Sequence, residues 1–407
     1  MEEIKQKVFP SSPRKRQRIV EFKSQDLTPF LCLAILIVIL VAGLWPFNFL
    51  AGNKVAWLPD QDGVHFYGQG IIASTEPLNN KQKLLFPNKS ITLEIRLHPI
   101  LVTSNLPHIL TLYDGHTPDI FLVGQWKSHL IIRSRTDNPT MRKKGKTYGE
   151  IGLKNALQKD QDCLVTITSG AGVTTLYLNG KFMHAYANHH MLAGITESPV
   201  RLVLGNSPTG ESYWNGKLLG LAVYNRVLSS DQVFKNYVAW TGKVPLRISA
   251  DDGCLGIYPF NERTGTKVRN EINAINTLTI PKTFTPVQRK SLYPLGSEFR
   301  WNLSLFQDIA TNIIGFIPLG FFFSALLLKI TRLRRLPAYL LIAILGTGFS
   351  LTIELIQAYL PTRDSSLIDV VMNSAGAILG VAVYQILSKT GVREFNRNDL
   401  NKRGSYE

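Results

Sequence analysis

The sequence predicts a multi-domain protein in which four transmembrane α-helices accompany an extracytoplasmic all-β sandwich. Three observations predict this class. Four apolar runs are long enough to cross a bilayer. Lys and Arg gather beside these runs in a one-sided pattern. The long segment between the first run and the other three contains short alternating strands separated by turn signals.

The composition excludes wholesale disorder and a disulfide framework. Of the 407 residues, 45% are hydrophobic, 18% charged and 10% aromatic, which is too apolar for a disordered chain. Cys32, Cys163 and Cys254 are too few and too scattered for a disulfide framework or a zinc site. Cys163 and Cys254 remain open as a pair or as two buried thiols. The net charge of +16 indicates an anionic partner such as nucleic acid, a membrane surface or a wall polymer.

The first apolar run, Pro29–Phe47, carries no charge. At about 1.5 Å per residue it spans roughly the 30 Å hydrocarbon core of a bilayer. A buried core helix and a cleaved signal peptide are the alternatives. The run is apolar all round and longer than the usual signal core, which favours a membrane span. We therefore predict a basic cytoplasmic tail at 1–27 and a transmembrane helix at 28–50.

Three further apolar runs follow the long polar segment. They predict transmembrane helices at 309–328, 337–360 and 367–387, which together form a membrane domain at 308–388. Polar insertions make each run less uniform than the first one. Their close succession favours short links and antiparallel neighbours.

Basic residues orient these spans. Lys and Arg are frequent in residues 1–26, in the link 329–336 and in the tail 389–407, whereas the other short link holds only Arg363. With four spans, the three basic segments fall on one side of the plasma membrane, which the positive-inside rule assigns to the cytoplasm. Both termini are then cytoplasmic and residues 51–307 extracytoplasmic. Because orientation accounts for the N-terminal cluster, we predict no nucleic-acid partner.

The extracytoplasmic segment has the local signals of a β-sandwich. Ser90–Pro99 alternates apolar and polar residues strictly, which is typical of a half-buried strand. Asn179-Gly180 lies between two strand-like runs and predicts a tight hairpin turn. Gly216–Tyr224 is another strand, and Ser229–Gln232 forms a capping box for one short helix at 230–240.

The stretches LYLNGKFMHAYA, PVRLVLGN and WNGKLLGLAVYNRVLSSDQVFKNY resemble the concanavalin A-like, laminin-G-like jelly-roll sandwiches. The residues that carry the closing pattern are Gly216, Leu218, Leu221, Tyr224, Arg226, Leu228 and Ser229. The resemblance implies a jelly-roll sandwich at 54–245, followed by a strand-containing connector at 246–307. It also implies that calcium is compatible with the sandwich, although no acidic loop specifies a site. We predict no metal site and no cofactor.

Paired catalytic acids are missing from the sandwich sequence. Jelly-roll glycan hydrolases place two carboxylates on one face of a strand, and no such E-x-D-x-E pattern occurs. Asp160 and Asp162 are expected to be solvated turn residues, and Glu94 stands alone on its strand. Four tryptophans are expected in the core, with stacking on sugar as the alternative: Trp57, Trp126, Trp214 and Trp240. The sequence therefore leans against an enzyme.

Polar side chains recur near the outer ends of the last three predicted spans. Such groups cost several kcal/mol inside a bilayer unless they are satisfied, so they need a reason to be there. They come in pairs three or four residues apart, which share one helix face. The predicted polar membrane pocket consists of Asp308, Asn312, Glu354, Gln357, Arg363, Asp364, Asp369 and Asn373.

Small residues in the same spans predict close helix packing. Gly315 and Gly320 lie in one span, and Gly376 and Gly380 form a G-x-x-x-G spacing in another. Pro318 is expected to kink its helix, because its ring removes one backbone hydrogen bond.

These spans resemble the VanZ-like family of membrane proteins. The motifs are N-x-x-G-F-x-P-L-G-F from Asn312, E-x-x-Q from Glu354, and R-D-x-x-x-x-D-x-x-x-N-x-x-G-x-x-x-G from Arg363. They cover about 305–388, and Pro46-Phe47 resembles the end of the family's first span. The resemblance implies cell-envelope work linked to tolerance of a glycopeptide antibiotic, teicoplanin, and defines no reaction. The departure is a sandwich where a short outer loop normally stands.

Two classes of function stay open from the sequence. In the first, the sandwich binds an envelope glycan or wall polymer and the spans anchor it among membrane lipids. In the second, the polar membrane pocket makes the protein a carrier or enzyme for a lipid-linked or phosphate-bearing envelope molecule. Glu354 would then act as a base and Arg363 as an anion clamp. A third interpretation gives the polar residues only a structural role in joining three helices.

Overall fold

The computed structural model describes residues 27–78, 89–116, 120–135, 147–191, 199–242, 253–272, 276–289, 291–293, 303–331, 333–361, 363 and 365–403. The chain divides into two compact units. The sandwich unit comprises residues 43–301 and 351–370. The helical unit comprises residues 1–42, 302–350 and 371–407.

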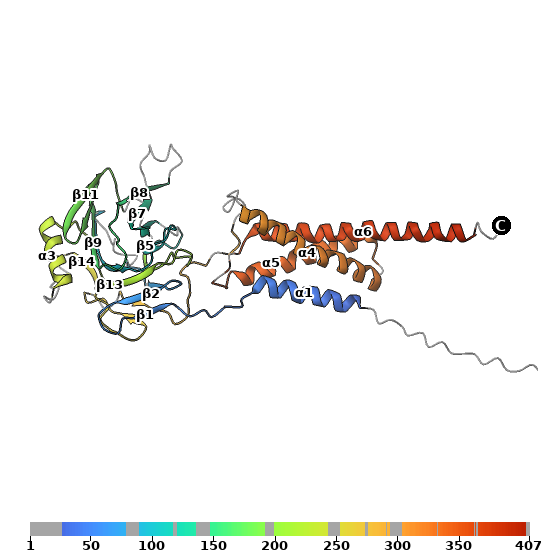
Figure 1. The fold of residues 1–407 in the computed structure, drawn as a ribbon, viewed down its shortest axis with the longest axis horizontal. Coiled ribbons are helices and arrows are strands. Elements are labelled where there is room, and N and C mark those ends of the chain that lie inside the picture. Colours follow the sequence, from blue (N-terminus) through green and yellow to red (C-terminus); the bar gives the residue numbers. More distant parts are fainter. Residues whose placement is uncertain are drawn as a thin grey trace, which may run out of the picture. The chain divides into compact units, whose positions relative to one another are not determined.

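An all-β sandwich dominates the sandwich unit (Figure 1). Its first sheet has the order β1-β2-β13-β4-β9-β10-β11, and β14 pairs with β13. All of these strand pairs are antiparallel. The strands are β1 Val55–Trp57, β2 Val64–Tyr67, β4 Ile91–Pro99, β9 Cys163–Gly170, β10 Val173–Leu178, β11 Lys181–Ala187, β13 Asn215–Tyr224 and β14 Cys254–Tyr258.

The second sheet has the order β15-β16-β3-β12-β5-β6-β7-β8 and is also antiparallel throughout. Its strands are β3 Ile72–Ser74, β5 His108–Tyr113, β6 Phe121–Trp126, β7 His129–Arg135, β8 Tyr148–Leu153, β12 Arg201–Leu204, β15 Lys267–Val268 and β16 Leu278–Thr279. The predicted strands therefore occur, and they are divided between the two sheets.

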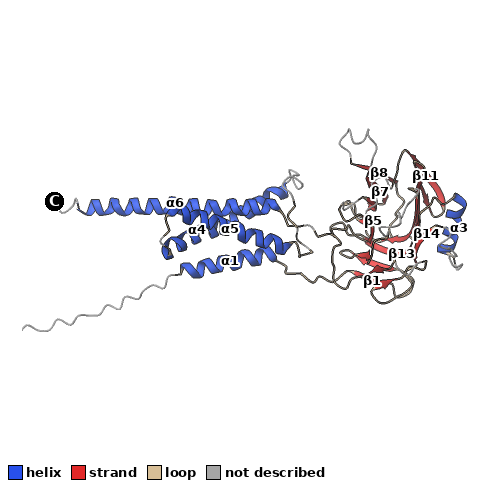
Figure 2. Ribbon diagram, turned by 180° about the vertical axis from the view of Figure 1, so that it is seen from behind, coloured by secondary structure: helices blue, strands red, loops and turns tan. Residues whose placement is uncertain are grey.

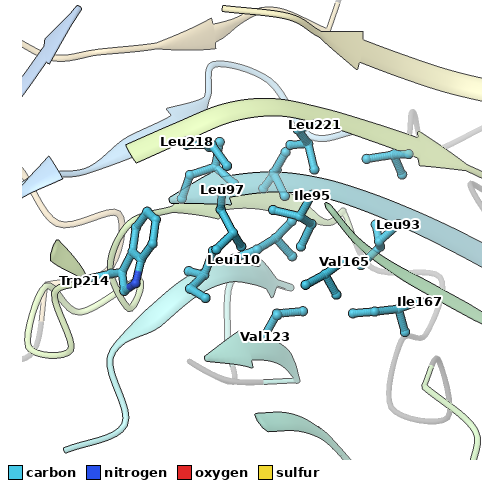
Figure 3. Close-up of a cluster of buried hydrophobic side chains, with 14 of the residues drawn as sticks. Leu93, Ile95, Leu97, Leu110, Val123, Val165, Ile167, Trp214, Leu218 and Leu221 are labelled. Carbon is cyan, nitrogen blue, oxygen red and sulfur yellow. The ribbon is translucent and has the colours of Figure 1, made fainter. Parts of the chain in front are cut away.

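The main core lies between the two sheets. Leu93, Ile95 and Leu97 of β4 are fully buried, as the strict alternation of that strand predicts. Figure 3 shows these side chains together with Leu110 of β5 and Val165 of β9, which come from both sheets. Burial of such side chains contributes roughly 1.5–3 kcal/mol each, and it is the main term that holds the sandwich together.

Local signals place one helix and one hairpin where the sequence predicts them. Helix α3, Ser230–Thr241, begins with the capping box of Ser229 and Gln232. The turn between β10 and β11 has positive φ at both Asn179 and Gly180.

The outer face of β4 is covered rather than solvated at Glu94. Its carboxylate is fully buried and accepts hydrogen bonds from Trp240 Nε1 at 3.0 Å, Asn236 Nδ2 at 2.9 Å and Tyr224 Oη at 3.2 Å. Asn236 and Trp240 belong to α3, so Glu94 attaches that helix to the sheet. Burial raises the pKa of the Glu94 carboxyl above its usual range.

The sandwich extends beyond the boundary expected at residue 245. Strand β14 pairs with β13 in one sheet, and β15 and β16 extend the other sheet beside β3. The predicted connector at 246–307 therefore supplies strands to both sheets. Cys163 and Cys254 are buried free thiols, which settles their open pairing, and burial raises the pKa of Cys163 to about 12.

Helices α1 (Thr28–Leu44), α4 (Leu303–Ile330), α5 (Arg335–Gln357) and α6 (Leu367–Arg403) run alongside one another (Figures 1 and 2). Three described segments are long and apolar enough to cross a membrane, namely Leu305–Ile330, Arg335–Gln357 and Leu367–Thr390. Helix α1 has 17 residues and falls short of that length. A protein with three membrane-capable helices is therefore shown, and the fourth span stays a prediction. Helix α6 also continues to Arg403, through most of the expected tail.

Candidate functional site

Glu354 of the predicted polar membrane pocket completes the start of helix α6. Its side chain is 2% exposed, and Oε2 accepts a hydrogen bond from the backbone N–H of Ser366 at 2.8 Å. Ser366 Oγ in turn accepts from the backbone N–H of Ile368 at 3.1 Å. The first N–H groups of a helix have no partner within it, so these two acceptors satisfy part of that need.

Gln357 and Arg363 each donate a hydrogen bond to a backbone carbonyl at the C-terminal end of helix α1. Gln357 Nε2 donates to the carbonyl of Gly43 at 2.8 Å, and Arg363 Nε donates to the carbonyl of Trp45 at 3.1 Å. The last carbonyls of a helix lack intrahelical partners, and side-chain donors commonly supply them. These bonds favour the structural interpretation for both residues.

Asn373 joins α6 to α5 within the helical unit. Its Nδ2 donates to Ser350 Oγ at 2.9 Å, and nearby Thr347 Oγ1 donates to Ser374 Oγ at 2.8 Å. Asn373 is 5% exposed, and its Oδ1 has no hydrogen-bond partner among the described residues.

The rest of the predicted pocket is spread over both units. Asp308 is exposed, Asn312 and Asp369 are half-buried, and Asp364 lies outside the described residues. Members of the set fall in the helical unit and in the sandwich unit, so convergence of the whole pocket stays a prediction.

The glycines of the helical unit separate into two groups. A Cβ on Gly320 would meet the backbone carbonyl of Ala377, and a Cβ on Gly376 or Gly380 would meet the backbone of α4. These three positions bring α4 and α6 into backbone contact. Gly315 differs from the prediction, since nothing lies within 4 Å of its added Cβ. Pro318 lies inside α4, which continues through it, and the expected kink stays a prediction.

Two cavities in the sandwich unit share Tyr67 in their linings. The strand cavity has a volume of about 550 Å³ and is lined by Leu58, Pro59, Asp60, Gln61, His65, Tyr67, Ile100 and Lys217. The junction cavity has a volume of about 570 Å³ and is lined by Lys54, Tyr67, Gly68, Gln69, Gly210, Glu211, Tyr213 and Pro361.

The exposed Tyr67 lines both cavities and the exposed Tyr213 lines the junction cavity; we refer to this pair as the tyrosine ridge. Tyr67 is 53% exposed and Tyr213 is 52% exposed. The ring of His65 lies 3.8 Å from that of Tyr67, so the two side chains of β2 support each other. Burial lowers the pKa of His65, which keeps this ring uncharged at neutral pH. The cationic groups that line the cavities are Lys54 and Lys217, one in each.

The link between α5 and α6 contributes Pro361 to the wall of the junction cavity. Gln69 Nε2 donates to the carbonyl of Pro361 at 3.1 Å, which attaches β2 to that link. Glu211, another wall residue, accepts from Tyr293 Oη at 2.8 Å. The backbone N–H of Tyr293 donates to the carbonyl of Ser365 at 2.9 Å, and its own carbonyl accepts from Leu367 at 3.2 Å. Residues of the sandwich therefore form hydrogen bonds with the segment that precedes α6 and with Tyr293 beside it.

Sequence reasoning missed this pair of tyrosines. The alternation in β2 shows that Tyr67 faces away from the core, but nothing local sets it apart from other outward residues. The expected core position is wrong for Trp126, which is 41% exposed on β6, and Trp57 is half-buried. Trp214 is fully buried with Nε1 donating to Gln125, and Trp240 of α3 is 9% exposed with Nε1 donating to Glu94. Within the described residues, no group of three or more His, Cys, Asp and Glu side chains could hold a metal ion.

A β-sandwich joined to helices of membrane length defines a membrane protein with an all-β domain. Residues 254–388 match the VanZ/LLP1 family model, and residues 74–234 match a model of the concanavalin A-like lectin/glucanases superfamily, Laminin_G_3. The C-terminal part of the chain is therefore similar to the VanZ/LLP1 family and the sandwich to the concanavalin A-like superfamily, as the motifs predicted. The VanZ/LLP1 match begins at Cys254, so it includes strands β14 to β16 as well as the last three helices.

Several solved structures are similar to part of this chain. A protein of Bacteroides ovatus ATCC 8483 proposed to bind carbohydrate is 13% identical, with 58% of this chain and 62% of that chain covered and a TM-score of 0.38. The binding domain of botulinum neurotoxin DC in complex with SialylT is 16% identical, with 47% and 46% covered and a TM-score of 0.34. The CBM40 of Ruminococcus gnavus IT-sialidase, bound to α2,3-sialyllactose, is 13% identical, with 44% and 97% covered and a TM-score of 0.32. This chain spans less than two thirds of the first two structures. No curated protein matches this chain.

Proposed function

We propose that this protein is an integral membrane protein of the cell envelope whose sandwich binds a glycan or wall polymer. The single observation that supports this function is the exposed tyrosine ridge, in which Tyr67 lines both cavities and Tyr213 lines the junction cavity. The aliphatic face of a sugar ring packs on an aromatic ring, while its hydroxyl groups need polar partners at the edge. Gln61, Gln69 and Lys217 provide such partners around the ridge.

The size of the cavities fits this proposal. Ligand sites usually have volumes of about 300–1,000 Å³, and each cavity falls in that range. Two cavities that share Tyr67 would hold neighbouring sugars of one chain. An extended glycan therefore fits the ridge better than a single sugar does.

Binding by the intact protein in nanodiscs tests the proposal. A panel of soluble glycans and purified wall polymer would be titrated against the natural protein and Tyr67→Ala or Tyr213→Ala variants. We expect each variant to weaken binding at least about tenfold, because each removes an aromatic ring on which a sugar would stack. Phe182→Ala is the matched control, since Phe182 is 60% exposed on β11 at the opposite edge of the same sheet. Equal losses in the Tyr67 and Phe182 variants would contradict the proposal.

We also propose the predicted orientation, with the sandwich outside the plasma membrane and both termini in the cytoplasm. A Lys181→Cys variant carries an exposed thiol on β11, while the natural cysteines are buried. A membrane-impermeant thiol reagent should label this variant on intact cells and should not label the natural protein. The VanZ likeness motivates a role in teicoplanin-type tolerance. Loss of the Tyr67 ridge should then lower tolerance at unchanged membrane abundance.

A second candidate function is a carrier or enzyme for a lipid-linked or phosphate-bearing molecule within the bilayer. The observation that favours it is Asn373 Oδ1, a buried acceptor without a hydrogen-bond partner among the described residues. The bonds of Glu354 and Gln357 to backbone groups favour the structural interpretation instead. Asn373→Ala should abolish the cellular phenotype at normal membrane abundance if this second function exists.

A further inference from the structure

We infer that the junction cavity binds a saccharide that is still attached to a membrane lipid through phosphate, held where the saccharide leaves the bilayer. The inference rests on the proposed function and specifies its ligand. Three features of the sandwich unit lead to it: the origin of the cavity wall, the exposed apolar side chains beside that wall, and the cations near it.

The wall places the cavity close to the end of a membrane-length helix. Helix α5 ends at Gln357, and Pro361 follows four residues later in the chain. Four residues reach at most about 14 Å even when fully extended. Pro361 lines the cavity, and its carbonyl is bonded to Gln69. A ligand in the cavity therefore lies within headgroup distance of the hydrocarbon boundary.

Exposed aromatic and apolar side chains mark that boundary on the same unit. Trp45 is 63% exposed, Phe47 43%, Leu50 80% and Tyr359 60%. Trp45 lies just after the end of α1, and Tyr359 lies just after the end of α5. Aromatic anchors are enriched at such positions in membrane proteins. The bond from Arg363 to the Trp45 carbonyl holds the two chain segments together. Exposed apolar side chains grouped in this way are typical of a surface that contacts a membrane or a partner.

Lys54 lines the cavity, and Arg289 belongs to a segment that is bonded next to its wall. The Arg289 guanidinium stacks 4.6 Å above the ring of Tyr359. The neighbouring Gln288 donates its backbone N–H to the carbonyl of Pro208, next to the 210–213 wall of the cavity. Neither Arg289 nor Lys54 forms an ion pair within the described part of the chain. Guanidinium and ammonium groups are the usual partners of phosphate.

These features select among envelope glycans. A polymer in the outer wall would reach the strand cavity as readily as the junction cavity. A saccharide joined to a lipid is delivered beside a cavity whose wall includes Pro361 of the link after α5, and the bilayer raises its effective concentration there. The phosphate of the lipid linkage would meet Arg289 and Lys54, while the sugar stacks on Tyr213.

Binding to the intact protein in phosphatidylcholine nanodiscs tests this inference. Three probes carry one saccharide: a polyprenyl-diphosphate lipid, a neutral diacylglycerol lipid, and the free soluble sugar. We expect the diphosphate lipid to bind at least about tenfold more tightly than the soluble sugar, and more tightly than the neutral lipid. The double variant Lys54→Gln/Arg289→Gln should remove the preference for phosphate and keep binding of the soluble sugar. Lys181→Gln, a change of an exposed lysine on β11, should alter nothing.

The outcomes separate this inference from the proposed function. Equal binding of all three probes, or of the two lipid probes, overturns the inference and leaves glycan binding intact. Binding of a polyprenyl diphosphate without sugar at the same strength also overturns it. If none of the three saccharide probes binds, the inference fails together with the proposed function. A preference for the diphosphate lipid that the double variant abolishes supports the inference.

Discussion

Replacing Gly320 by alanine should weaken the contact between α4 and α6. The added Cβ would meet the Ala377 carbonyl oxygen and would lie 2.8 Å from its carbonyl carbon and 3.1 Å from its Cα. Ordinary contact begins near 3.4 Å, and all three atoms belong to the backbone, so no side chain can rotate away. The helices must therefore move apart by several tenths of an ångström.

The size of the effect follows from two opposing terms. Overpacking a close contact typically costs about 1–3 kcal/mol. Alanine in a helix interior is about 1 kcal/mol more favourable than glycine, which offsets part of this cost. We expect Gly320→Ala to lower the free energy of unfolding by up to about 2 kcal/mol, the difference that remains after this offset.

Reversible unfolding of the full chain in mixed detergent micelles measures this difference. Gly315→Ala is the matched control on the same helix, since nothing lies within 4 Å of its added Cβ. This control should leave stability unchanged or raise it by up to about 1 kcal/mol. A Gly320→Ala protein as stable as the Gly315→Ala protein would refute the close contact and the reasoning built on it.

Two further predictions concern buried carboxylates. Because burial raises the folded-state pKa of Glu94, its contribution to stability is present below about pH 4.5 and is lost as the pH rises through the raised value. Burial lowers the pKa of His108 to about 4, so His108 makes the protein more stable as the pH rises, opposite to Glu94. Only the difference in stability between the natural protein and Glu94→Gln therefore isolates the effect of the carboxylate. Thermal unfolding across this pH range should show a smaller loss in the variant, and identical pH profiles would count against the buried carboxylate. Glu354→Ala should lower thermal stability, by about 1–3 kcal/mol, because it leaves the Ser366 N–H without its acceptor, whereas Glu354→Gln keeps an oxygen there and should retain stability. A Glu354→Gln protein that is abundant and folded but has lost its cellular phenotype would assign Glu354 to a functional site instead.

The sequence by itself determined the features that depend on nearest neighbours along the chain. The alternation of β4, the capping box at Ser229 and the Asn179-Gly180 turn all follow from backbone geometry within a few residues. Membrane-capable helices follow from length and apolar content alone. The motifs of the last three helices were also sufficient to indicate the VanZ-like family.

Only the tertiary structure decided which distant residues meet. Tyr67 and Tyr213 come from separate parts of the sandwich, and Gln69 meets Pro361 across 292 positions of sequence. Glu94 is buried because α3 lies over it, and β14 joins β13 because that edge needs a hydrogen-bonding partner. Such contacts depend on how whole elements pack against one another, and the local pattern of apolar and polar residues does not predict that packing. The two cavities therefore belong to the folded chain, although each residue that lines them is ordinary in its own segment.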